Sequence, residues 1–182
     1  MSTGCIKMLN RDIRNMKEEK KHLPIFGIGP FYIISTSLIT ILAMVLNYTV
    51  PAIQKGQLRN STVVFTFYFF GCLFAVEGIY LILRAMFGRN RIYDYIMTNR
   101  LCTTGVYAVV RNPIFSGVNH ICGGILVFMH NWYLFPLGFL SWVYLTVMVK
   151  NTEEKWLTEL HGDEYRKYCR KVNRVIPRLP RY

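Results

Sequence analysis

Two blocks of the sequence carry the side chains best suited to chemistry, and a long stretch with almost no charge separates them. The first block, residues 103–117, contains Arg111, and the second, residues 151–177, begins with the adjacent carboxylates Glu153 and Glu154. A guanidinium binds carboxylate or phosphate oxygens with two hydrogen bonds, whereas paired carboxylates suit an ammonium group or two ribose hydroxyls. If the fold brings the blocks together, they can hold a ligand that carries both signs of charge.

The first block also contains the start of a helix. Pro113 suits the first helical position, and it disfavours the α conformation at Asn112, whose side chain is then expected to cap the helix. A helix N-terminus beside Arg111 offers free N–H groups and a positive dipole end to an anion. The same residues are equally typical of a capped membrane span whose Arg reaches the interface.

The carboxylate pair and the nearby aromatic residues each allow two interpretations. The carboxylates could simply neutralise Arg111 or Lys155. Flat surfaces for an adenine ring or a sulfonium cation are available at Tyr107, Phe115 and Trp156, but aromatic residues also gather where a membrane meets water.

Four apolar segments must position these residues. The chain is 52% hydrophobic, and a membrane span needs about 20 mostly apolar residues. Segments of this kind run over Phe31–Val50, Thr62–Leu83, Pro113–Met129 and Trp132–Val149. The last two are short and form a hairpin that leaves the first block and returns to the second, so both blocks are expected at the same membrane face.

The distribution of basic residues predicts the orientation. With four spans, 20 of the 22 Lys and Arg residues lie on one side and two on the other, and the more basic side is normally cytoplasmic. We therefore expect a multi-pass protein with both termini in the cytoplasm, in the plasma membrane if the source is prokaryotic. The net charge of +12 is then explained by attraction to anionic lipids rather than by nucleic acid.

These features predict an all-α integral membrane protein in a single domain, 1–182, with about four transmembrane helices. Residues 1–29 form a cytosolic amphipathic N-terminus, and 30–99 contain two spans and an interfacial helix over 84–99. Residues 100–182 hold the hairpin and a cytosolic helical tail. The five cysteines are scattered without a C-x-x-C pattern, so no metal site is expected.

At this point the sequence resembles a known family. G-V-Y-x-x-V-R-N-P-I-F-S-G followed by E-E-x-x-L-x-x-x-x-G-x-x-Y-x-x-Y-x-x-x-V-x-R-x-I-P is similar to the isoprenylcysteine carboxyl methyltransferases, to which integral-membrane phospholipid N-methyltransferases are related. The resemblance covers roughly residues 95–180. It implies a membrane methyltransferase that uses S-adenosylmethionine and acts on a lipid-like or prenylated acceptor. It also implies that Arg111 and Arg174 act in catalysis and that the cofactor is bound by Gly105, Tyr107, Arg111, Asn112, Phe115, Gly117, Glu153 and Glu154.

Two positions depart from the family pattern, which more often has His in place of Asn112 and Tyr in place of Phe115. Asn does not titrate, so this position cannot supply a catalytic base. The departures leave open a non-catalytic membrane scaffold or binding protein that retains the fold. The sequence also leaves open whether oxygen, nitrogen or sulfur is methylated.

Glu77 is a further candidate because it lies in the middle of the second predicted span, where carboxylates are rare and usually functional. The simpler expectation is an inward carboxyl that is either protonated or bonded to Asn119, His120 or Tyr80.

Overall fold

The computed structural model describes residues 27–88 and 92–178, and the regular structure of this part is entirely helical. Most of the predicted N-terminal amphipathic segment, residues 1–26, lies outside the described residues. The helices are α2 (Gly29–Thr49), α3 (Pro51–Gln54), α4 (Ser61–Phe87), α5 (Ile92–Met97), the 3₁₀ helix η1 (Gly105–Ala108), α6 (Pro113–Phe128), α7 (Phe135–Asn151) and α8 (Glu153–Lys171).

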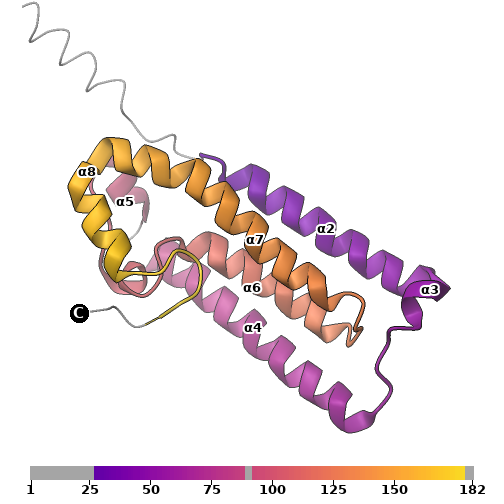
Figure 1. Cartoon of the computed structure of the whole chain (residues 1–182). Coiled ribbons are helices and arrows are strands. Elements are labelled where there is room, and N and C mark those ends of the chain that lie inside the picture. The colour runs from indigo at the N-terminus through magenta and orange to yellow at the C-terminus, as the bar shows by residue number, and fades with distance from the viewer. Residues whose placement is uncertain (1–26, 89–91, 179–182) are drawn as a thin grey trace, which may run out of the picture.

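Four long helices form a bundle, with α8 bent across one end (Figure 1). They lie where the four apolar segments predicted them, but only α2 and α4 have both the length and the composition of a membrane span. Helix α6 is apolar but has only 16 residues, or about 24 Å at 1.5 Å per residue. The described helices therefore give two candidate spans, and the prediction of four spans is not confirmed.

Helix α2 has mostly small and polar residues on its buried face and large apolar residues on its exposed face. The buried face consists of Gly29, Tyr32, Thr36, Thr40, Ala43 and Asn47. The exposed face includes Ile34, Leu38 and Leu42, each more than half exposed. In water this arrangement would be unfavourable, but in lipid helices associate through close packing and hydrogen bonds. The polarity of α2 thus supports a membrane protein.

Two glycine contacts bring α4 and α6 unusually close together. A Cβ added at Gly78 would lie 2.5 Å from the Gly117 carbonyl oxygen, and one added at Gly117 would lie 2.6 Å from the Gly78 oxygen. Gly71 and Gly124 repeat the contact one heptad away, where a Cβ at Gly124 would lie 2.8 Å from the Gly71 oxygen. No side chain fits between the two backbones at these points.

The connections at the far end of the bundle are held by a buried amide pair. Asn131, in the turn between α6 and α7, donates through Nδ2 to Asn47 Oδ1 at 2.7 Å and to the Ile53 carbonyl at 2.8 Å. The backbone of the same turn pairs with the connection after α3, since Leu58 N donates to the His130 carbonyl at 2.9 Å. Both connections therefore lie at the end opposite α8.

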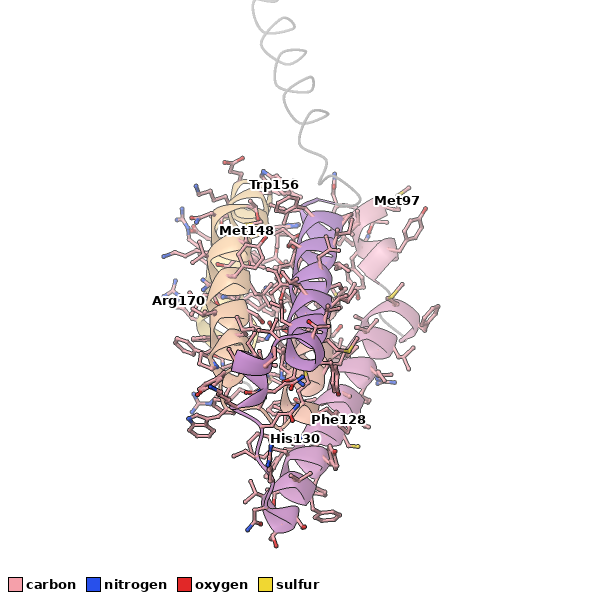
Figure 2. The ribbon with its side chains drawn as sticks, turned by 90° about the vertical axis from the view of Figure 1, so that its right-hand side faces the viewer. Met97, Phe128, His130, Met148, Trp156 and Arg170 are labelled. Atoms are coloured by element: carbon pink, nitrogen blue, oxygen red, sulfur yellow. The ribbon has the colours of Figure 1, made fainter. Side chains whose placement is uncertain are left out.

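Helix α8 leaves the bundle at a sharp break. Thr152, between α7 and α8, has φ −122° and ψ −82°, and within α8 Gly162 has φ 52°. The sequence His161-Gly162 predicts an end or a kink of the helix, and the break at Gly162 confirms it. Figure 2 shows Trp156 of α8 at the same end of the bundle as Met97 of α5, far from His130.

Two sequence expectations for α4 and the segment after it are corrected by the structure. The interfacial helix expected over 84–99 is divided, because α4 continues to Phe87 and the separate helix α5 covers only Ile92–Met97. Glu77 is not fully inward, because its side chain is 39% exposed. The partner expected for it is present nevertheless, as His120 Nε2 lies 3.8 Å from Glu77 Oε2.

Candidate functional site

The two motif blocks meet through their backbones. The segment after α8, residues 172–178, which we call the strap, runs beside the residues that precede α6 (Figure 1). Arg111 N donates to the Asn173 carbonyl at 2.9 Å, Asn112 N to the Arg174 carbonyl at 3.2 Å, and Arg178 N to the carbonyl of residue 109 at 3.1 Å. The apolar face of the tail predicts packing on the membrane face or on the protein, and the strand-like pairing goes beyond this expectation.

The pairing assembles a cluster of Arg111, Glu154 and Arg174. Arg111 NH2 lies 2.8 Å from Glu154 Oε1. Arg174 reaches the same carboxylate with two bonds, from Nε to Oε1 and from NH2 to Oε2, both at 2.7 Å. This two-pronged geometry is the strongest form of Arg–carboxylate pairing, and the hydrogen bond to Glu154 raises the pKa of Arg174.

The cluster is largely withdrawn from water and is not neutral. The side chains of Arg111, Glu154 and Arg174 are 7%, 11% and 25% exposed. Two guanidiniums and one carboxylate leave one unit of positive charge. The buried Nε of Arg111 has no hydrogen-bond partner, so the cluster retains an unused donor. It can therefore accept one negatively charged group.

Glu153, the neighbouring carboxylate, has a different environment. A Cβ added at Gly27 would lie 3.1 Å from Glu153 Oε1 and 3.3 Å from the ring of Trp156, so these groups pack together. Burial raises the pKa of Glu153 to about 7. Since a positive ligand favours the ionised carboxylate, this side chain can respond to a cation at neutral pH.

Asn112 does not cap α6, contrary to the prediction. It occupies the position before Pro113, but its side chain makes no capping hydrogen bond. Nδ2 donates instead to the Arg174 carbonyl at 3.1 Å. The capping expectation was wrong because the strap supplies a carbonyl from another part of the chain, which local sequence cannot show.

We expect Asn112→Ala to loosen the strap. The Arg174 carbonyl would lose one of its two donors, at a cost of about 0.5–1.5 kcal/mol. Limited proteolysis should then cleave residues 172–178 faster, while the helices stay protected. Arg178→Ala is the matched control. Arg178 bonds to the carbonyl of residue 109 through its backbone N–H, so the substitution leaves this hydrogen bond in place. Equal cleavage of the two variants would contradict a role for the Asn112 side chain.

Two other predicted cofactor residues, Tyr107 and Phe115, are buried in the protein interior. Tyr107 is 5% exposed and packs with Ala85 and Cys102, and its carbonyl accepts from Tyr168 Oη at 2.5 Å. Phe115 is in the bundle core, with its ring edge-on to Tyr32 at 5.7 Å between centroids.

The backbone structure itself requires glycine at both predicted positions, Gly105 and Gly117. Gly105 begins η1 with φ 63°, in the left-handed region that glycine adopts readily. Gly117 faces α4 in the close helix contact. The structure therefore brings Arg111, Asn112, Glu154 and Arg174 together, whereas Gly117 points away from them into the bundle.

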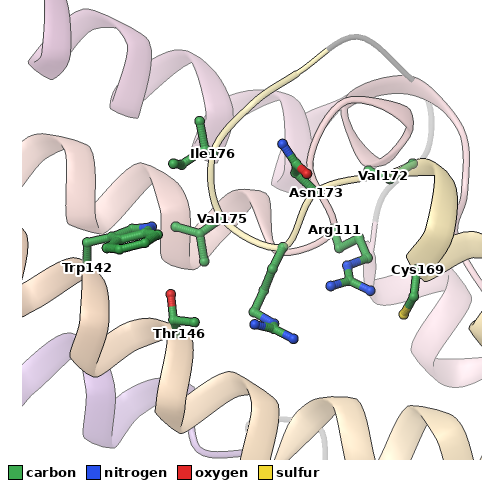
Figure 3. A pocket seen from close by; sticks show the side chains of 9 residues that line it. Arg111, Trp142, Thr146, Cys169, Val172, Asn173, Val175 and Ile176 are labelled. Atoms are coloured by element: carbon green, nitrogen blue, oxygen red, sulfur yellow. The ribbon is translucent and has the colours of Figure 1, made fainter. Parts of the chain in front are cut away.

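A pocket of about 290 Å³ adjoins the cluster. One wall is α7, which contributes Trp142 and Thr146, and the strap covers these residues with Val175 and Ile176, as Figure 3 shows. Arg111 lies on the other side of the pocket, near Cys169. The full lining is Arg111, Trp142, Thr146, Cys169, Val172, Asn173, Arg174, Val175 and Ile176.

Sequence reasoning missed Trp142, which was treated only as part of a span. Its indole Nε1 is buried without a hydrogen-bond partner. A Trp well inside an apolar helix is a signal that could have been noticed, because its N–H usually needs a partner when buried. Among the described residues, no group of three or more His, Cys, Asp or Glu side chains is placed to hold a metal ion.

One family of known proteins matches the chain. The family model for phospholipid methyltransferases matches residues 62–164, which include nearly all of α4, the whole of α6 and α7, and both carboxylates of the second block. No curated protein and no solved structure shows significant similarity to the chain. The match covers more than half of the sequence, and the chain belongs to the phospholipid methyltransferase family of integral-membrane methyltransferases.

Proposed function

We propose that this protein transfers a methyl group from S-adenosylmethionine to a lipid-like or prenylated acceptor in the membrane. The observation that carries the proposal is the cluster of Arg111, Glu154 and Arg174, which joins the two motif blocks at one end of an apolar bundle. Opposite charges next to a pocket at this position suit a zwitterionic cofactor and an acceptor that is dissolved in lipid.

The charged residues fit the amino-acid end of the cofactor. The carboxylate of that end matches the surplus positive charge and the unpartnered Nε of Arg111. Its ammonium group matches Glu153 and Glu154. When bound, the cofactor supplies a methyl group on a positively charged sulfur. We extend the proposed site to the motif residues Gly105, Tyr107, Asn112 and Phe115, whereas Gly117 is assigned to the helix contact with α4.

The chain's own residues then act by holding and desolvating the reactants. Arg111 and Arg174 fix the orientation of the cofactor's carboxylate, and the strap and α8 keep water from the centre. Positioning of this kind can supply most of a transfer rate when the acceptor attacks the methyl carbon in line. A carboxylate or thiolate acceptor needs no base, whereas an amine must lose a proton.

The proposed setting is a cytoplasmic membrane face. The cluster lies at the end of the bundle where α8 contributes many basic side chains. At the opposite end, the basic residues of the connections are Lys55 and Arg59. With α6 and α7 as the third and fourth spans, both ends of the chain lie on the basic side. A lipid acceptor can then reach the site from within the bilayer.

The test of the proposed function is methyl transfer by purified protein in vesicles. The protein is incubated with S-adenosylmethionine labelled in the methyl group and with natural lipid extract, and labelled lipids are identified by mass spectrometry. Arg111→Lys is the matched variant, since it keeps the charge but loses the planar guanidinium with its several N–H donors. Binding of the cofactor without any labelled lipid would favour the non-catalytic interpretation.

Glu153 should make cofactor binding depend on pH. Its pKa of about 7 in the free protein means that most of it is protonated at pH 6, and a cationic ligand must displace that proton. We therefore expect the affinity for S-adenosylmethionine to rise about eightfold between pH 6 and pH 7.5, following the ionised fraction. Calorimetry in two buffers of different ionisation enthalpy would also detect the proton release.

Glu153→Gln is the control for this pH dependence. Its side chain cannot ionise, so its affinity should stay level over the same range. An equally steep rise in the Gln variant would show that another group is responsible.

A further inference from the structure

The pocket beside the cluster has a polar end and a mostly apolar end. Arg111 and Arg174 belong to the first, and Val175 and Ile176 contribute to the second. Its volume of about 290 Å³ is at the lower limit of small-molecule sites, which run from about 300 to 1,000 Å³. It is therefore better suited to part of a lipid than to a whole nucleoside cofactor.

Trp142 lies at this apolar end and has an indole N–H without a hydrogen-bond partner. Its Nε1 is buried without a partner, although the residue lines the pocket. Indole N–H donates and does not accept, so the missing partner is an acceptor such as a carbonyl oxygen. Figure 3 shows Trp142 and Arg111 on opposite sides of the pocket, so one compact anion does not account for both donors.

The surroundings of Trp142 indicate where its partner comes from. Neighbouring positions on α7 are exposed and apolar, with Phe139 at 63% and Val143 at 37%. In the proposed membrane setting these residues face lipid tails. The first strong acceptors below the head group of a glycerolipid are its acyl ester carbonyls, whereas an alkyl ether offers only a weak acceptor.

We propose that Trp142 is a specificity-determining residue that donates a hydrogen bond from Nε1 to an acyl ester carbonyl of the lipid acceptor. The head group of that lipid lies at the polar end of the pocket, beside the cofactor that Arg111 and Arg174 hold in the proposed function. This inference rests on the proposed function for its description of the ligand as an acceptor, but the contact itself is a binding property. The protein therefore selects ester-linked over ether-linked lipids.

The test compares two short-chain ethanolamine phospholipids that differ only in having acyl ester or alkyl ether linkages. Their binding to the full-length protein in detergent is measured by thermal-shift titration, which needs no turnover. The wild type should bind the ester form about fivefold more tightly, the size expected for one neutral hydrogen bond. Trp142→Phe keeps an aromatic ring but lacks the donor, so it should bind both forms at the level of the ether.

Two control measurements accompany this test. Trp132→Phe is the matched control, because Trp132 is 62% exposed and stacks on Phe135 away from the pocket, and it should keep the ester preference. Binding of S-adenosylhomocysteine should be unchanged in Trp142→Phe.

The outcomes separate this inference from the proposed function. Equal binding of the two lipids by the wild type would overturn the role of Trp142, even if methyl transfer is observed. Weakened S-adenosylhomocysteine binding in Trp142→Phe would also overturn it, because the pocket would then belong to the cofactor. An ester preference without methyl transfer would support the proposed role of Trp142 and contradict the proposed function.

Discussion

Glu154→Ala is expected to lower the free energy of unfolding by about 3–5 kcal/mol, the usual cost of removing one partner from a buried ion pair. Glu154 is the carboxylate partner of both Arg111 and Arg174, so its loss leaves two guanidiniums facing each other in a poorly solvated position. Unfolding by heat or denaturant in detergent would measure the effect. Glu164→Ala, an exposed carboxylate on the same helix, should change stability by no more than about 0.5 kcal/mol.

A triple variant separates stability from ligand binding at the cluster. Replacing Arg111 and Arg174 with Met and Glu154 with Leu removes all three charges together, and such replacements are often neutral or stabilising. The triple variant should recover much of the stability that Glu154→Ala loses, yet bind no S-adenosylhomocysteine. If it binds the ligand normally, the cluster is structural only.

Gly78→Ala is the second substitution with a large expected effect. The new Cβ would lie 2.5 Å from the Gly117 carbonyl oxygen, and a backbone atom cannot rotate aside as a side chain can. Helices α4 and α6 would have to separate, so we expect a loss of about 1–3 kcal/mol or more. Thermal unfolding and the yield of monodisperse protein would both report it.

Gly123 provides the matched control for the helix contact. It lies on α6 beside Gly124, yet a Cβ there would meet nothing within 4 Å. Gly123→Ala should be neutral or should stabilise the helix by up to about 1 kcal/mol, because Ala is the better helix former. Similar losses in Gly78→Ala and Gly123→Ala would mean that helix propensity rather than close packing explains both.

The parts of the fold that the sequence predicted are those with a local signal. Apolar runs located α2, α4, α6 and α7, and Pro113 marked the start of α6. The hairpin argument correctly placed Arg111 and Glu154 at the same end, and the alternative in which the carboxylate neutralises Arg111 is now an observed contact at 2.8 Å. Ligand binding at this cluster stays a prediction.

The parts that could not be predicted depend on contacts between distant segments. Asn112 has the residue type of a helix cap, but the Arg174 carbonyl, 62 residues later, takes its side-chain amide. Gly117 fits a ligand-binding motif, yet its contact with Gly78 is visible only when two helices are in place. Trp142 was counted as an apolar residue of a span, although an indole N–H well inside an apolar helix is itself a signal that a partner is needed.

The glycine contacts give one side of the site a rigid base. They join α6 to α4 at two points one heptad apart, and Arg111 lies just before α6. Glu154 and Arg174 belong to α8 and the strap, which follow the break at Thr152 and are anchored by buried apolar side chains, Val175 in the bundle core and Tyr165, Tyr168 and Val172 in a cluster of their own. Moving α8 or the strap to admit a ligand would expose these side chains, so such an opening costs more free energy than the opening of a loop with few apolar contacts.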